Sequence, residues 1–302
     1  MKVALFCPVR LEKSALSIAL QGIGRAQEAV GKMTCIFYDD NVSADSSAAL
    51  RRFVEEGENR VVLPKIPDLP ESSHSRRKTN RGWTPQTVDR IATIKNAALE
   101  VVKGSECDAV FLMDADLICH PCLIDALLEC DGEIVSGVFW TEFKEGGPLM
   151  PNCWDIQTYR HRSADSIIQL REPGVYEVGG LGAATLVKKK ALEAGVNFAR
   201  IPNLDMWGED KHFCVRAVCL GFRLYVDTRY PLFHMYRPRD VSEGEQWLRD
   251  GCPPEYIRSK LNGEWERRVR EAWARSNGAG EMTVRRLLAR GLRRVAAWVD
   301  EK

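Results

Sequence analysis

The segment Asp108–Leu117, which reads DAVFLMDADL, constrains the fold of this 302-residue chain more than any other stretch. An unbroken apolar run, Ala109 to Met113, leads directly into two aspartates, Asp114 and Asp116. A run of this length is typical of a strand buried on both faces of a parallel sheet. Because ligands of open α/β sheets bind beyond the carboxyl ends of such strands, both aspartates are predicted to lie at a ligand site.

Two carboxylates at the mouth of a buried strand repel each other and lose hydration unless a cation lies between them. A hard divalent cation would satisfy both and leave coordination positions for phosphate oxygens. The alternative interpretation is that Asp116 caps a helix that follows the strand. The pair by itself does not decide between metal binding and capping.

The residues before this segment alternate between strand and helix patterns. The predicted strands are 3–9, 35–38 and 60–66. The predicted helices are 15–30, 49–54 and 84–104. This βαβαβ order is typical of the nucleotide-binding half of a doubly wound sheet.

The chain after Leu117 continues the pattern less regularly. Its predicted strands are 133–140, 224–227 and 231–234, and 176–187 is predicted to enter a Gly-rich turn as a strand and to leave it again. Its predicted helices are one opened by Pro121 and one over 210–220. A segment without hydrophobic periodicity, 67–83, interrupts the first half, and a loop of this length is usually functional or disordered.

Composition narrows the class of protein. The hydrophobic share of 45% is ordinary for a soluble enzyme, and a net charge of +1 gives no reason to expect a polyanion-binding protein. Ten cysteines without a secretory signal favour a reducing, cytoplasmic location. No apolar run approaches the roughly 18 residues of a membrane-spanning helix. A zinc site at Cys119–Cys122 is disfavoured because no second ligand pair follows at finger spacing.

Residues 237–302 are mostly helical in pattern and rich in arginine. Within 282–299, apolar residues at helical spacing oppose a row of arginines. Such a basic amphipathic helix can dock on the core, form a homodimer with a second copy, or make peripheral contact with an anionic membrane. Docking or pairing is favoured, since any surface helix with a core-facing stripe has this pattern.

The Asp-Ala-Asp sequence at 114–116 resembles the DxD motif of GT-A glycosyltransferases, which are metal-dependent enzymes that use nucleotide-sugar donors. Further segments follow in the order of that family. Tyr38–Ser43 resembles its DD-x-S turn, Trp207–Ala217 resembles its Glu-Asp helix, and His234 matches the histidine that completes the metal site in many members. The resemblance covers roughly residues 2–236.

The resemblance implies an α/β fold of the GT-A-like Rossmann type, with a mixed, mostly parallel sheet flanked by helices and a helical C-terminal extension. It divides the chain into a catalytic domain, 1–236, and a basic helical extension, 237–302. Within the catalytic domain, the nucleotide-binding half covers about 1–117 and the acceptor half covers about 118–236.

The resemblance also implies which residues bind the donor, a nucleoside-diphosphate sugar. Asp39 is expected to accept a hydrogen bond from a base N–H, although a plain strand-end turn is the alternative there. Lys95 stands where the family often has arginine, which can make a bidentate contact that lysine cannot. Arg90, one turn earlier on the same predicted helix, is expected to reach the donor, and the alternative is that it belongs to a solvent-exposed basic face. The predicted donor-binding residues are Pro8, Val9, Arg10, Asp39, Asp40, Arg90, Lys95, Asp114, Ala115 and Gly180.

The implied metal ligands are Asp114, Asp116 and His234, with Asp116 as the first direct ligand and Asp114 supporting the ribose or a metal-bound water. Carboxylate, imidazole and phosphate oxygens suit Mn²⁺ or Mg²⁺. In inverting relatives the aspartate of the Glu-Asp helix deprotonates the acceptor hydroxyl, which assigns that role to Asp210 and an orienting role to Glu209. The alternative is that both carboxylates only stabilise a helix start.

These features predict a metal-dependent glycosyltransferase that transfers a sugar from a nucleoside-diphosphate sugar to an acceptor hydroxyl with inversion. The alternatives are a nucleotidyltransferase of similar fold and a non-catalytic nucleotide-sugar-binding protein. The acceptor is left open between a glycan, a lipid-linked molecule and, ranked last, a modified nucleic acid. Trp140 and Trp207 are the candidate acceptor contacts.

Overall fold

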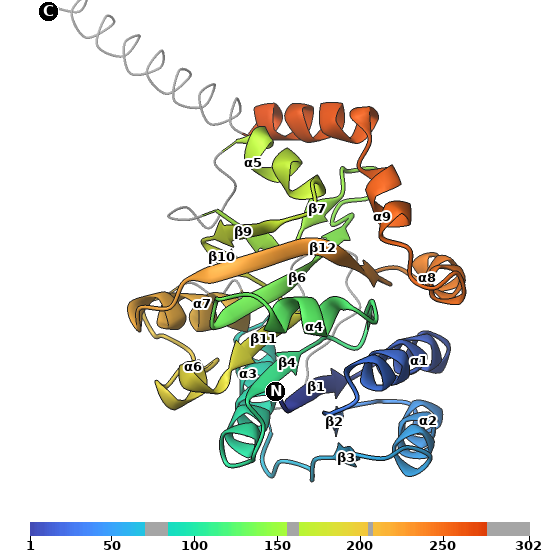
Figure 1. Ribbon diagram of the computed structural model, residues 1–302, viewed down its shortest axis with the longest axis vertical. Coiled ribbons are helices and arrows are strands. Elements are labelled where there is room, and N and C mark those ends of the chain that lie inside the picture. The colour runs from blue at the N-terminus through green and yellow to red at the C-terminus, as the bar shows by residue number, and fades with distance from the viewer. Residues whose placement is uncertain (70–83, 156–162, 205–207, 277–302) are drawn as a thin grey trace, which may run out of the picture.

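The structure, a computed structural model, describes residues 1–69, 84–155, 163–204 and 208–276 (Figure 1). Its centre is a ten-stranded sheet. The main path of the sheet runs through β3 (Arg60–Val62), β2 (Met33–Asp39), β1 (Val3–Val9), β4 (Ala109–Leu112), β11 (Thr185–Lys188), β6 (Ile134–Thr141), β12 (Leu224–His234) and β5 (Leu117–Ile118). Off this path, β7 (Met150–Pro151) pairs with β6, and β9 (Val175–Val178) pairs with β12. A separate pair is formed by β8 (Cys153–Trp154) and β10 (Gly180–Leu181).

Most strands of this sheet share one direction. β1 pairs parallel with β2 and β4, β2 pairs parallel with β3, and β6 pairs parallel with β12. β11 lies between β4 and β6 and is antiparallel to both. The predicted α/β fold with a mixed, mostly parallel sheet is therefore confirmed.

Both faces of the sheet are covered, which explains why its central strands are apolar along their whole length. Ala4 and Phe6 of β1 belong to one buried cluster, whereas Leu5 and Cys7 belong to another. The helices that contribute to the first cluster include α3 (Pro85–Lys103), α6 (Lys189–Glu193) and α7 (Glu209–Cys219). Those that contribute to the second include α2 (Ala44–Glu55) and α4 (Leu123–Leu128), and α1 (Lys13–Val30) contributes to both.

The predicted helix boundaries reflect capping chemistry. Thr84 is the N-cap of α3, and its side chain accepts a hydrogen bond from the backbone N–H of Thr87. Pro85 occupies the first turn, where its missing N–H has no helical partner to lose. α1 ends at Gly31, whose φ of 70° lies in the left-handed region that glycine adopts without strain.

Three predicted strands differ from the observed ones. The strand predicted at 60–66 is shortened to Arg60–Val62, whereas the strand predicted to turn within 176–187 is observed as β9, β10 and the first part of β11. The strands predicted at 224–227 and 231–234 are one strand, β12, with a register shift between Asp227 and Leu232. Pro231 lies within this shifted stretch, and proline has no N–H for a regular ladder.

The described part of the predicted C-terminal extension is helical but is not a separate unit. It contains α8 (Asp240–Arg249), α9 (Pro254–Lys260) and a helical segment at 263–276. Trp247, Ile257 and Trp265 are buried in the same cluster as Phe233 of β12. The core therefore continues past the predicted boundary at residue 236. The preceding segment also holds a short helix, α5 (Ala164–Ile168), and a 3₁₀ turn, η1 (Gln169–Arg171).

The amphipathic segment 282–299 and most of the 67–83 segment lie outside the described residues. Their predicted roles stay predictions. Within the described ranges, no helix is both long enough and apolar enough to cross a membrane.

Replacing Trp247 with alanine tests whether the C-terminal helices stabilise the whole fold. Its ring is buried against Phe233, and its indole N–H donates to the carbonyl of Pro253 at 3.0 Å. We expect Trp247→Ala to lower the free energy of unfolding by about 3–5 kcal/mol in one cooperative transition. Val218→Ala, at an exposed position of α7, is the control and should change it by less than about 0.5 kcal/mol. A separate early transition for the variant would show that these helices unfold independently.

Candidate active site

Asp116 and His234 are far apart in sequence and lie next to each other. After β4 the chain turns, with the N–H of Leu117 donating to the carbonyl of Asp114 at 3.2 Å. The short strand β5 then pairs antiparallel with the end of β12, and the N–H of Met235 donates to the carbonyl of Asp116 at 2.8 Å. This pairing places Nε2 of His234 3.3 Å from Oδ2 of Asp116.

The ring of His234 is held in place on its other sides. Its Nδ1 lies 2.8 Å from Oγ1 of Thr141, the last residue of β6. The ring of Phe139 packs edge-on against it with centroids 4.8 Å apart. When Nδ1 donates its proton to Thr141, the lone pair of Nε2 points toward Asp116, which is the arrangement of a metal-binding histidine.

Asp114 lies close to several charged groups at the same edge of the sheet. Burial raises the pKa of its carboxyl group to about 6, and the Lys95 ammonium opposes this shift. The negative charges of Asp116 and Glu209 raise the pKa further. The site therefore disfavours a second negative charge beside Asp116 unless a cation joins it.

Lys95 of α3 is paired with both carboxylates at the start of α7. Its Nζ lies 2.6 Å from Oε1 of Glu209 and 3.2 Å from Oδ1 of Asp210. Lys95 and Glu209 are buried, so this pair is a desolvated ion pair. The ammonium of Lys95 contacts these carboxylates, and its predicted contact with the donor stays a prediction.

The pKa values of Lys95 and Asp210 are both shifted by burial and by neighbouring charges. Burial lowers the pKa of Lys95, but the carboxylates of Asp210, Glu209 and Asp114 raise it more, so it lies well above the usual value. Partial burial raises the pKa of Asp210 to about 7, against the opposing effect of the Lys95 ammonium. A carboxyl group with a pKa near 7 is suited to take up and release a proton at neutral pH.

The residues predicted to bind the nucleotide meet at the carboxyl ends of β1 and β2. The N–H of Asp40 donates to the carbonyl of Val9 at 2.8 Å. The guanidinium group of Arg10 lies 3.3 Å from Oδ2 of Asp40, and Arg90 of α3 forms an ion pair with the same carboxylate. Arg10, Asp40 and Arg90 thus form a cluster in which two guanidinium groups contact one carboxylate.

Asp39 is more constrained than the sequence indicates. Its Oδ1 accepts hydrogen bonds from the backbone and side chain of Asn41 and from Oγ of Ser47. In the described contacts of this carboxylate all three bonds use Oδ1, so Oδ2 keeps its capacity to accept a hydrogen bond. The side chain of Val9 is fully buried, so this residue can meet a ligand only through its backbone.

Gly180, a predicted donor-binding residue, packs against an aromatic ring, and its contact with the donor stays a prediction. A side-chain carbon at this position would lie 1.9 Å from the indole ring of Trp154, so the glycine makes room for that ring. Gly182 is the glycine next to the site, since a Cβ there would lie 3.5 Å from Oδ2 of Asp210. Of the two candidate acceptor tryptophans, Trp140 is buried and Trp207 lies outside the described residues.

Asp116 and His234 supply one carboxylate and one imidazole, a donor set that fits Mn²⁺ or Mg²⁺. No group of three or more His, Cys, Asp and Glu side chains suited to a metal ion occurs in the described part of the chain. Of the three predicted metal ligands, Asp116 and His234 are in direct contact, and Asp114 lies near both. Phosphate oxygens and water would complete the coordination of such an ion.

Two features of the site were missed from the sequence. Thr141, which contacts His234, follows Trp140 at the end of a predicted strand, where a polar residue was a signal for a site at the sheet edge. The other is the pairing of Lys95 with the start of α7. Oδ1 of the adjacent Asn96 accepts from the N–H of Phe198 at 2.8 Å and thereby links α3 to the segment before α7.

No protein-family profile matches the chain, and no curated protein sequence matches it. Several solved structures are similar to its backbone at low sequence identity. Residues 1–349 of S. aureus TarS are 14% identical with a TM-score of 0.48, over 92% of this chain and 74% of that one. A longer S. aureus TarS structure is 12% identical with a TM-score of 0.49, over 82% of this chain and 39% of that one. The mannosyltransferase PcManGT from Pyrobaculum calidifontis, in complex with GDP-Man and Mn²⁺, is 16% identical with a TM-score of 0.45, over 96% of this chain and 79% of that one.

The buried ion pair makes Lys95 a residue whose removal should destabilise the fold. Lys95→Met keeps the length of the side chain but leaves Glu209 buried without its cation. We expect a loss of about 3–5 kcal/mol in the free energy of unfolding, measured by urea denaturation. Lys190→Met is the matched control, because Lys190 is exposed and its ion pair with Glu133 should contribute less than about 1 kcal/mol. Equal effects of the two substitutions would contradict the structural role of Lys95.

Proposed function

We propose that this protein is a metal-dependent glycosyltransferase that moves a sugar from a nucleoside-diphosphate sugar to an acceptor hydroxyl. The observation that carries the proposal is the 3.3 Å approach of Asp116 to His234 at the carboxyl edge of the sheet. The same edge carries the cluster of Arg10, Asp40 and Arg90 and the pair of Lys95 with α7. Parallel α/β sheets bind their ligands at this edge.

The donor would lie across this edge. Asp39 would accept from the base, and the Arg10–Asp40–Arg90 cluster would bind negatively charged or polar parts of the nucleotide. Asp116 and His234 would hold Mn²⁺ or Mg²⁺, with Asp114 close enough to orient a bound water. When bound, the cation would supply Lewis-acid stabilisation of the charge that develops on the leaving diphosphate.

Asp210 is the better of the two α7 carboxylates to act as base. Its side chain is 31% exposed, whereas that of Glu209 is 5% exposed and holds the shorter contact with Lys95. Asp210 would accept the proton of the acceptor hydroxyl as the oxygen attacks the sugar carbon. Lys95 and Glu209 would keep the Asp210 carboxylate oriented. A single displacement of this kind inverts the configuration at that carbon.

Removing the carboxylate of Asp116 tests the metal-dependent step. The wild-type protein, incubated with Mn²⁺ and a panel of nucleotide sugars, should release a nucleoside diphosphate from at least one of them. Asp116→Ala should lower this rate by about a hundredfold or more, since a catalytic cation contributes several kcal/mol to transition-state stabilisation. Asp125→Ala, at an exposed position of α4, should leave the rate unchanged.

The products of this reaction also separate the proposed function from its alternatives. Release of pyrophosphate would identify a nucleotidyltransferase. Tight binding of nucleotide sugars without turnover would identify a binding protein. Near-normal transfer by Asp116→Ala would contradict the proposed role of this residue.

The pH dependence of the reaction tests the role of Asp210. Its carboxyl group acts as a base only when deprotonated, and its pKa is raised to about 7. We therefore expect kcat/KM for nucleoside-diphosphate release to fall about tenfold per pH unit below about pH 7. Asp210→Asn should remove most of the activity at every pH. An acid limb near pH 4, typical of an ordinary carboxyl group, would contradict the assignment.

A further inference from the structure

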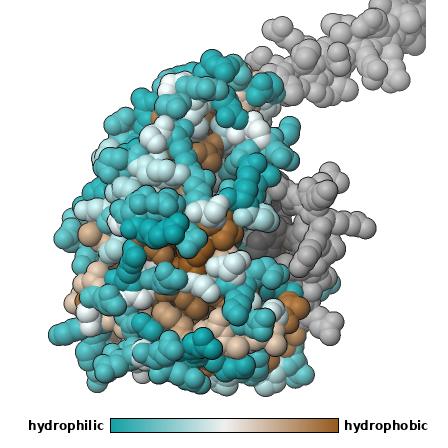
Figure 2. Space-filling model, turned by 90° about the vertical axis from the view of Figure 1, so that its right-hand side faces the viewer, coloured by the Kyte–Doolittle hydropathy of each residue, from teal (hydrophilic) through white to brown (hydrophobic). Residues whose placement is uncertain are grey.

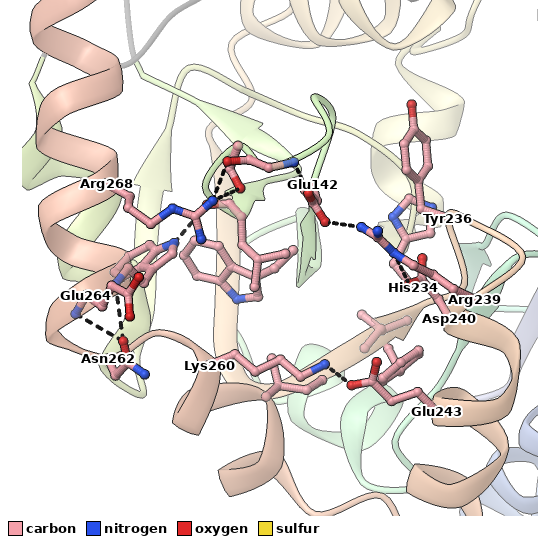
Figure 3. A pocket seen from close by; sticks show the side chains of 18 residues that line it. Glu142, His234, Tyr236, Arg239, Asp240, Glu243, Lys260, Asn262, Glu264 and Arg268 are labelled. Carbon is pink, nitrogen blue, oxygen red and sulfur yellow. Dashed lines mark hydrogen bonds and ion pairs between the residues drawn. The ribbon is translucent and has the colours of Figure 1, made fainter. Parts of the chain in front are cut away.

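A pocket of about 480 Å³ adjoins His234 on the side formed by the C-terminal helices (Figure 3). Its walls come from the end of β6, the segment 142–149, the end of β12, α8, α9 and the start of the helical segment 263–276. Its volume is within the range of small-molecule sites, which is about 300–1,000 Å³. The pocket adjoins the candidate metal site, because His234 lines the pocket and also contacts Asp116.

Exposed aromatic rings lie at the end of the pocket nearest His234. Tyr236 is 40% exposed, and its ring centroid lies 5.2 Å from that of His234. Phe143, which is 45% exposed, packs edge-on against Tyr236 at 6.0 Å. Trp140 and Trp265 form an edge-on pair with centroids 5.4 Å apart and contribute apolar surface to the pocket. An exposed ring beside a reaction centre offers a flat apolar surface to a ligand that also has polar edges.

The cations that line the pocket in the described part of the chain already have partners. Arg239 forms an ion pair with Glu142, and Lys260 forms one with Glu243. Arg268 donates to the backbone carbonyls of the 146–147 segment. A phosphate or sulfate group would meet one guanidinium group without an ion-pair partner among the described residues, that of Arg268, and it would also meet the four carboxylates that line the pocket, Glu142, Asp240, Glu243 and Glu264.

Polar groups suited to hydroxyls lie on the opposite side of the pocket from Tyr236, as Figure 3 shows for Glu264 and Asn262. Oδ1 of Asn262 accepts from the backbone N–H groups of Glu264 and Trp265, which leaves its amide N–H groups as donors. The carboxylate of Glu264 makes no hydrogen bond or ion pair with another described residue and can accept from hydroxyls.

We propose that this pocket binds a neutral saccharide, with one sugar ring against Tyr236 and hydroxyl groups bound by Glu264 and Asn262. Its role as the acceptor site rests on the proposed function. The chemistry matches a sugar, which has an apolar C–H face and a rim of hydroxyls that donate and accept. An anionic acceptor is disfavoured because the carboxylates that line the pocket outnumber its arginine and lysine residues.

Tryptophan fluorescence provides the test, because two tryptophans line the pocket. The full-length protein is titrated with cellotriose, mannotriose and N,N′,N″-triacetylchitotriose, without nucleotide or metal. We expect at least one of these neutral trisaccharides to bind. Tyr236→Ala and Glu264→Ala should each raise its Kd roughly tenfold.

Two matched variants show whether the effects are local. Tyr236→Phe keeps the ring and should change the Kd less than about twofold. Glu271→Ala removes a carboxylate from the same helical segment outside the pocket and should leave the Kd unchanged. The proposal is overturned if none of the trisaccharides binds, if Tyr236→Ala and Glu264→Ala leave binding unchanged, or if heparin binds there and the neutral sugars do not.

Calorimetry with UDP and GDP in the presence of Mn²⁺, on the same proteins, separates this proposal from the proposed function. Binding of a trisaccharide without binding of either nucleotide would support the saccharide pocket and contradict the glycosyltransferase. Binding of a nucleotide without any trisaccharide would overturn the pocket assignment and leave the proposed function standing.

Discussion

Repulsion between carboxylates is the constraint around which this structure is arranged. Asp114 and Asp116 follow β4, and Glu209 and Asp210 begin α7, so four acidic side chains converge on one edge of the sheet. Like charges this close and partly removed from water are costly unless cations join them. Lys95 offsets the α7 carboxylates directly. Under the proposed function, an external cation held by Asp116 and His234 would relieve the remaining repulsion.

The fold brings these groups together through backbone pairing. The strands β1 and β12 point toward the right-hand side of Figure 1, which is the face turned to the viewer in Figure 2. On that face hydrophilic residues predominate and hydrophobic ones gather near the middle. The antiparallel pairing of β5 with the end of β12 fixes Asp116 beside His234 through backbone hydrogen bonds. Preorganisation of this kind reduces the reorganisation that a bound donor would require.

Much of the fold could be predicted from the sequence because it depends on local patterns. The apolar run at Ala109–Met113 and the capping residues Thr84 and Gly31 each identify an element without knowledge of distant contacts. The partner of Lys95 could not be predicted in this way, since its ion pair spans 114 positions and depends on how α3 packs against α7. The packing of Gly180 could not be predicted for a similar reason, because the ring of Trp154 that lies against it comes from another strand.

The predicted division of the chain at residue 236 also shows that long-range contacts cannot be predicted from local sequence patterns. A change of composition marks the start of a basic, helical region, but composition does not show which residues it buries. Trp247 and Trp265 join the core of the sheet, and their helices complete a pocket beside His234. The C-terminal helices therefore contribute both to stability and to the candidate acceptor side of the site.

The most direct test of the account is to locate the cation. Crystals of the full-length protein grown with Mn²⁺ and either UDP or GDP would be measured at the manganese absorption edge. The account predicts an anomalous peak in contact with the carboxylate of Asp116, Nε2 of His234 and the diphosphate. A diphosphate bound at the sheet edge without a peak there, or a manganese site elsewhere in the molecule, would contradict it.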